Sequence, residues 1–187
     1  MSAESLHLSR SIQAMWRVGN VLALCGRGSE AIRVAVELEA KHPHHTFVKS
    51  LYVPTIHGVV AIFSEGDAAK GIDLLRATAR YELARDDGAP VLFRGIAYLR
   101  QKDAVRAAIE FDKIRAHPDT FKRLPTYAVA TLGAARAAAL GGNFDRSRQL
   151  YEEFLQLWKN ADPDLPMFVE AKKEYARLDG RRSEMSP

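Results

Sequence analysis

Three histidines near residue 40 are the first candidates for chemistry. In "AKHPHHTF", His42, His44 and His45 surround Pro43, and imidazole nitrogens are common ligands of zinc and copper. Glu39 and His42 also match the Glu-x-x-His spacing of di-iron bundles, but that chemistry needs a second such motif and two further carboxylates on facing helices. The sequence offers no second cluster of ligands, so we expect no metal site and no cofactor.

The position of this His-Pro pair in the chain favours a structural role. "AKHP" ends at Pro43, 12 residues after Ala31, and "RAHP" ends at Pro118, 11 residues after Ala107. A histidine near a helix C-terminus interacts favourably with the helix dipole, and proline commonly follows a helix end. We therefore interpret both His-Pro pairs as the ends of helices.

Other chemically capable residues also have structural explanations. Cys25 is the only cysteine, which excludes an intrachain disulfide and a zinc site built from several thiolates. Asp162 and Asp164 lie together in "DPD", and Asp164 is placed to cap the helix that Pro166 begins. The sequence contains no Gly-rich phosphate loop and none of the "HRD" and "DFG" motifs of protein kinases. We predict that the chain is not an enzyme.

Composition and charge indicate a folded chain without a nucleic-acid or membrane partner. The 187 residues are 47% apolar, which is typical of one globular domain. The 27 basic and 23 acidic residues give a net charge of +4 and are interspersed along the chain. Neither a signal-peptide core nor a run of about 20 apolar residues is present. We expect a cytoplasmic location.

The apolar spacing is helical throughout, and no segment alternates with the two-residue period of a half-buried strand. Short breaks rich in Gly and Pro, such as "CGRGS", "SEGD" and "LGGN", separate the helical segments. We therefore predict an all-α fold. Pro54 allows two interpretations: it begins a helix, or, if that helix starts at Thr46, it lies inside and bends it.

Aligning the breaks shows a repeat. A small residue follows each of four turns, and these residues recur 40, 36 and 40 residues apart: Ala31, Gly71, Ala107 and Ser147. A second repeated position lies four residues after each of them: Ala35, Leu75, Phe111 and Tyr151. A repeat of this length built from two helices is typical of an α-solenoid, whose units stack because each is too small to bury its apolar face alone.

The repeat predicts a single domain over residues 1–178. Its hairpins span roughly residues 6–43, 46–83, 88–118 and 124–160, and a capping helix follows at 165–178. In that helix Phe168, Ala171, Tyr175 and Leu178 form an apolar stripe suited to shielding the last repeat. Residues 179–187 are predicted to be a flexible tail.

The third hairpin resembles the tetratricopeptide repeat (TPR). "FRGIAYLRQKDAVRAAIEFDKI" at 93–114 carries Gly95, Tyr98, Ala107 and Phe111, similar to the Gly-x-x-Tyr and Ala-x-x-x-Phe signature of that family. Residues 45–178 also resemble the C-terminal TPR region of multidomain bacterial serine/threonine protein kinases and related regulators, without the kinase domain. The resemblance implies a right-handed solenoid that acts in signalling as a scaffold or regulatory module for protein partners.

First helices line the concave side of such a stack, so the alignment predicts a groove that binds a peptide or a helix. Asn20, Arg100 and Arg136 supply its polar groups. For each apolar member the alternative is packing between hairpins, and the alternative functions are a small-ligand sensor and self-association. The predicted groove residues are Trp16, Asn20, Val60, Phe63, Leu92, Ile96, Leu99, Arg100, Leu132 and Arg136.

The first helix is apolar nearly all round, as in "IQAMWRVGNVLALC", which is typical of a helix buried on two sides. Either a preceding repeat or a second copy of the chain should cover it. We predict a homodimer through Leu8, Ile12 and Met15.

Overall fold

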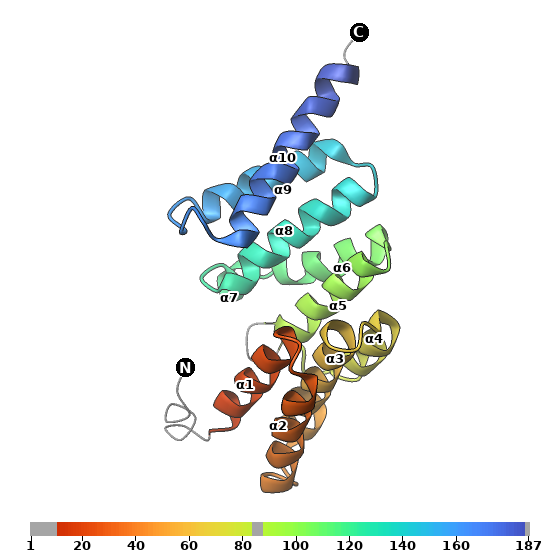
Figure 1. The fold of residues 1–187 in the computed structure, drawn as a ribbon, viewed down its shortest axis with the longest axis vertical. Helices are drawn as coiled ribbons and strands as arrows, with labels where there is room; N and C mark the ends of the chain where they lie inside the picture. The colour runs from red at the N-terminus through yellow and green to blue at the C-terminus, as the bar shows by residue number, and fades with distance from the viewer. Residues whose placement is uncertain (1–10, 84–87, 186–187) are drawn as a thin grey trace. The chain divides into compact units, whose positions relative to one another are not determined.

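The computed structural model describes residues 11–83 and 88–185, with side chains described as far as Leu178 (Figure 1). These residues form helices and turns, and none of them lies in a β-strand. The prediction of an all-α fold is confirmed. The chain divides into two compact units, Met1–Ala97 and Tyr98–Pro187. No helix within the described part of the chain is long and apolar enough to cross a membrane.

The first unit contains two helical hairpins. It comprises α1 (Ile12–Leu24), α2 (Gly28–Lys41), the π-helical turn η1 (Val48–Tyr52), α3 (Val53–Phe63), α4 (Ala68–Arg76) and the first part of α5 (Ala89–Arg100). α1 packs against α2 and α3, and α3 packs against α4. Asp67 begins α4 by accepting a hydrogen bond from the Lys70 amide, as an N-cap side chain does.

Pro54 lies in the first turn of α3, directly after the wider turn of η1. Helical backbone begins at Thr46, so Pro54 lies inside a longer helical segment. This is the second of the two interpretations that the sequence allowed. Proline cannot donate a hydrogen bond, and its ring crowds the carbonyl four residues earlier. The π-helical turn accommodates this change: the Val53 amide donates to the Val48 carbonyl, five residues back.

The second unit contains the end of α5, then α6 (Ala104–Arg115), α7 (Pro118–Phe121), α8 (Pro125–Leu140), α9 (Phe144–Leu157) and α10 (Pro166–Met185). α8 packs against α6 and α9, and α10 lies against α9 (Figure 1). α10 continues to Met185, through residues that the sequence assigned to a flexible tail. Phe168, Ala171 and Leu178 of its apolar stripe are buried.

The repeated small residues lie where two helices approach closely. Gly71 replaces the usual alanine because a Cβ there would lie 2.3 Å from Ile62 Cγ1 and 3.0 Å from the Gly58 carbonyl oxygen. Ser147 replaces the alanine for another reason: its buried hydroxyl donates to the Ala135 carbonyl oxygen at 2.9 Å. Each departure from the repeat pattern therefore has a local physical cause.

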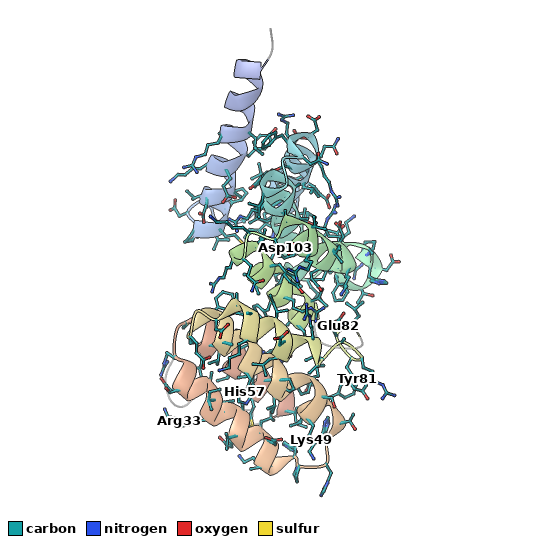
Figure 2. All side chains as sticks on the ribbon, turned by 90° about the vertical axis from the view of Figure 1, so that its right-hand side faces the viewer. Arg33, Lys49, His57, Tyr81, Glu82 and Asp103 are labelled. Atoms are coloured by element: carbon teal, nitrogen blue, oxygen red, sulfur yellow. The ribbon has the colours of Figure 1, made fainter. Side chains whose placement is uncertain are left out.

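A buried ion pair joins the segment after α4 to α5. Arg94 Nη2 lies 2.7 Å from Glu82 Oε2, and the two side chains are only 3% and 10% exposed; Figure 2 shows Glu82 just after α4. Arg94 also donates to the Leu75 carbonyl near the end of α4, which the Thr78 hydroxyl contacts as well. The pair ties two consecutive hairpin elements together.

Candidate peptide-binding surface

The structure buries half of the residues predicted for the groove. Trp16, Asn20, Val60, Leu92 and Leu132 are each at most 9% exposed, so their side chains pack within the chain. This is the alternative that the sequence left open for the apolar positions. The other predicted residues keep accessible surface: Phe63, Ile96, Leu99 and Arg136 are half-buried, and Arg100 is exposed.

Asn20 is buried on α1 with its hydrogen bonding incomplete. Its Nδ2 donates to the Trp16 carbonyl at 3.1 Å, whereas Asn20 Oδ1 and Trp16 Nε1 have no hydrogen-bond partner among the described residues. The Trp16 ring packs against Tyr52, with centroids 5.3 Å apart. Buried polar atoms of this kind usually bond to a water or a ligand, so this face of α1 has unused hydrogen-bonding capacity.

The remaining sequence candidates show no catalytic arrangement. His45 Nδ1 accepts from the Val48 amide at the start of η1, and the described residues contain no group of three or more metal-ligating side chains. Cys25 is an exposed free thiol. Asp164 does not cap α10: the first helical bond runs from the Val169 amide to the Leu165 carbonyl. The Asp162 carboxylate accepts from the Asp164 amide instead.

The first helix exposes a different apolar surface from the predicted dimer face. Leu8 lies outside the described residues, Ile12 is half-buried and Met15 is 8% exposed. Val21 and Leu24, near the other end of α1, are 49% and 44% exposed. The accessible apolar side chains of α1 therefore gather toward its C-terminal end.

A hollow of about 460 Å³ lies along one face of α10. Its lining residues recur every three or four positions, which places them on one side of the helix. We call this feature the α10 hollow; its lining consists of Asp164, Pro166, Val169, Glu170, Lys173, Glu174 and Arg177.

Hydrogen bonds hold the Glu174 carboxylate beside the α10 hollow, and Glu170 lies near the same Arg136 guanidinium. Arg136 Nε of α8 lies 3.0 Å from Glu174 Oε2, and its Nη2 lies 3.8 Å from Glu170 Oε2. The Tyr151 hydroxyl of α9 donates to Glu174 Oε2 at 2.9 Å. Burial raises the pKa of Tyr151 well above its ordinary value, and the Glu174 charge adds to this effect. Tyr151 is therefore a hydrogen-bond donor at neutral pH.

Two cations of the α10 hollow have no neighbouring carboxylate of this kind among the described residues. Lys173 and Arg177 lie one helical turn apart and are both exposed. Neither forms an ion pair with a described residue, in contrast to Arg136. The neighbouring Lys172 points elsewhere, with its Nζ 4.0 Å from the centroid of the Phe168 ring. The hollow thus combines two carboxylates near Arg136 with two cations, and a third carboxylate, that of Asp164, which form no ion pair with a described residue.

The α10 hollow was not predicted, because the apolar stripe of residues 165–178 indicates only a capping helix. Extending the repeat would have found it: Val169 and Lys173 follow Leu132 and Arg136 by 37 residues, within the range of the earlier repeat separations. α10 therefore occupies the position of a further first helix. Val169 and Lys173, the equivalents of the predicted groove residues Leu132 and Arg136, line the hollow.

Comparison with solved structures identifies the architecture. Two crystal structures match, both of a putative kinesin light chain from Podosopora anserina with nearly identical TPR-like repeats. One, a form with a single substitution, is 16% identical, with a TM-score of 0.63 over 92% of this chain and 88% of that one. The other is 15% identical, with a TM-score of 0.61 over 92% and 89%.

The fold is a TPR-like α-solenoid. No protein-family model and no curated protein match the chain. The predicted fold class is confirmed, whereas the resemblance to kinase-associated regions stays a prediction. Because the TPR-like neighbours are so distant in sequence, they show the architecture of this chain and leave its ligand to be argued from its own residues.

Proposed function

We propose that this TPR-like chain is a protein-interaction module that binds a peptide or a helix of its partner on the α10 hollow. The observation that carries the proposal is the hollow itself, about 460 Å³ in volume and lined by charged side chains around Val169. Repeat proteins of this type bury extended ligands along the surface formed by their first helices. α10 holds the register of a first helix, and the hollow lies on its face.

The surroundings of the α10 hollow support binding without reorganisation. Arg136, Glu174 and Tyr151 hold one another through bonds of 3.0 and 2.9 Å, so α8, α9 and α10 contribute to one fixed wall. A preorganised surface loses less conformational entropy when a ligand binds. The same residues do not form a nucleophile and base pair, so binding rather than catalysis is the function that they favour.

A selection from a displayed library of random peptides tests this proposal with the full chain as bait. Peptides enriched on the parent should also bind Gln156→Trp, which adds the same bulky side chain at an exposed position of α9. They should be lost on Val169→Trp, because the indole would fill the hollow. Equal recovery on both variants would place the binding surface elsewhere, and no enrichment on the parent would reject the proposed function.

A second candidate, self-association, rests on the apolar surface of α1. Val21 and Leu24 are among the most exposed large apolar residues of the described chain, and they lie on a different side of α1 from the predicted face of Ile12 and Met15. A dimer should give twice the mass of the monomer in light scattering, and Val21→Asp/Leu24→Asp should restore the monomer. A monomeric parent at high concentration would reject this candidate.

A further inference from the structure

We propose that two copies of the chain associate through the outer face of α6, with the two α6 helices antiparallel. Three residues of this face recur every three or four positions and so lie on one side of the helix, and a fourth lies in the turn that leads into it. We call this surface the α6 stripe; its members are Lys102, Val105, Ile109 and Asp112. The inference is independent of the α10 hollow and of the exposed apolar residues of α1.

Two large apolar side chains of the stripe are exposed one turn apart. Val105 is 71% exposed, more than any other large apolar residue of the described chain, and Ile109 is 55% exposed. The repeat does not require an apolar pair here, because the other second helices have small or polar residues at the equivalent positions: Ser29, Ala69 and Asp145, then Arg33, Asp73 and Gln149. Contact with a partner would remove this apolar surface from water.

Lys102, in the turn before α6, departs from the repeat in a second way. Its φ of 59° lies in the left-handed region, whereas the three equivalent turns have glycine there, with φ of 75°, 76° and 79°: Gly26, Gly66 and Gly142. A residue with a Cβ is strained in this conformation and glycine is not. The adjacent Asp103 pairs with Arg106, but Lys102 forms no ion pair with a described residue. Strain that the repeat avoids elsewhere marks Lys102 as a functional position.

The α6 stripe is complementary to a second copy of itself. In an antiparallel pair with its two-fold axis at the level of Ala107, each residue faces the one equally far on the other side of that level. Val105 then meets the partner's Ile109, and Ile109 meets the partner's Val105. The same register sets Lys102 opposite the partner's Asp112, since these residues lie five positions before and after Ala107.

The charges of the stripe favour this arrangement over others. Asp112 pairs with Arg115 and Arg146, yet its side chain is still 38% exposed, so it can also accept from a lysine. A parallel pair would instead place Lys102 against the partner's Lys102, and like charges in contact oppose association. Because the stripe carries one charge of each sign, it matches its own copy better than a strongly acidic or basic ligand.

Disulfide cross-linking tests the contact and its register in a Cys25→Ser background, which removes the exposed native thiol. Under mild oxidation, a mixture of Val105→Cys and Ile109→Cys, one of them tagged, should form the mixed disulfide at least about fivefold faster than either variant alone. Residues opposed in the pair meet directly, whereas the two copies of one residue are offset by about 6 Å along the axis. Val36→Cys, at a 59% exposed position of α2, is the matched control.

Sedimentation equilibrium from about 10 μM to 1 mM measures the association, because so small a surface supports only a weak dimer. The parent should approach twice the monomer mass, Val105→Asp/Ile109→Asp should stay monomeric, and Val36→Asp should behave as the parent. Lys102→Gly should raise the melting temperature but weaken association about fivefold, since two symmetric ion pairs are lost. A residue with only a structural role would not separate these two effects.

The outcomes decide between this surface and others. A parent that is monomeric at 1 mM, or a mixed disulfide that forms no faster than that of the Val36→Cys control, would overturn the proposal. A dimer that persists in folded Val105→Asp/Ile109→Asp and is lost in Val21→Asp/Leu24→Asp would assign self-association to α1 instead. Circular dichroism establishes that each variant is folded, and the peptide selection on the α10 hollow is unaffected by either result.

Discussion

The buried pair of Glu82 and Arg94 predicts a large change in stability from a single substitution. In Glu82→Leu, the Arg94 guanidinium would stay in a site where its side chain is 3% exposed, without the carboxylate now 2.7 Å away. Removing one partner of a buried ion pair costs about 3–5 kcal/mol. This is a large part of the roughly 5–15 kcal/mol by which native proteins are stable.

Removing both charges should recover most of that loss. In Glu82→Leu/Arg94→Met no charge of the pair remains, and the Leu75 carbonyl still accepts from the Thr78 hydroxyl at 2.7 Å. Replacing a whole buried pair by apolar residues of similar size is often neutral. We expect the double variant to be at least about 2 kcal/mol more stable than Glu82→Leu alone.

Urea unfolding followed by circular dichroism measures these differences, with the slope of the transition as a check that the unfolded surface is unchanged. The exposed pair of Asp73 and Arg76, with side chains 73% and 54% exposed, provides the control. Asp73→Ala should cost less than about 1 kcal/mol. The reasoning is refuted if Glu82→Leu costs no more than this control, or if the double variant is as unstable as the single one.

Local contacts predict three further effects. Gly71→Ala should lower the free energy of unfolding by about 1–2 kcal/mol in the same urea assay, because its Cβ would lie 2.3 Å from Ile62 Cγ1 while alanine favours the helix by only about 1 kcal/mol. Tyr151 should not ionise at pH 10 in an ultraviolet titration of the folded chain, because its pKa is raised on folding. Its contribution to stability is therefore complete below pH 10 and is lost as the pH rises further. The Asp103 carboxylate, at the start of α6 (Figure 2), has its pKa lowered chiefly by the Arg106 amide and then by the Arg106 guanidinium. NMR titration of Arg106→Ala should therefore still find the pKa of Asp103 below 3.8, and its stabilising effect should be lost as the pH falls through that lowered value.

The fold was predictable because its determinants are local and periodic. Ala31, Ala107 and Ser147 are buried where the repeat places them, and the Gly-Asn turn before α9 caps its helix as such sequences do. The position of Pro54 was ambiguous because a π-helical turn has no clear sequence signal. The Glu82–Arg94 pair was equally hidden, since nothing in either local sequence indicates that two charges will be buried together.

The candidate site was predicted less well because helical spacing alone does not separate packing from exposure. Leu92 and Leu132 have the spacing of groove residues, yet they are 9% and 1% exposed. An apolar side chain on a first helix can be buried either against a ligand or against the adjacent helices. A shift of one residue in register decides which of these two contacts it makes. Charged residues are more informative at such positions, because a Lys or Arg is almost never fully buried without a partner.

The repeat register relates Lys173 of α10 to equivalent residues that are less exposed in the earlier hairpins. The equivalent position in successive first helices holds Asn20, Val60, Ile96, Arg136 and Lys173. The first two are buried, the next two are half-buried, and Lys173 is exposed. Asn20 belongs to α1, which packs on α3, the first helix of the next hairpin. The equivalent position is therefore buried in the first two hairpins, half-buried in the next two and exposed on α10.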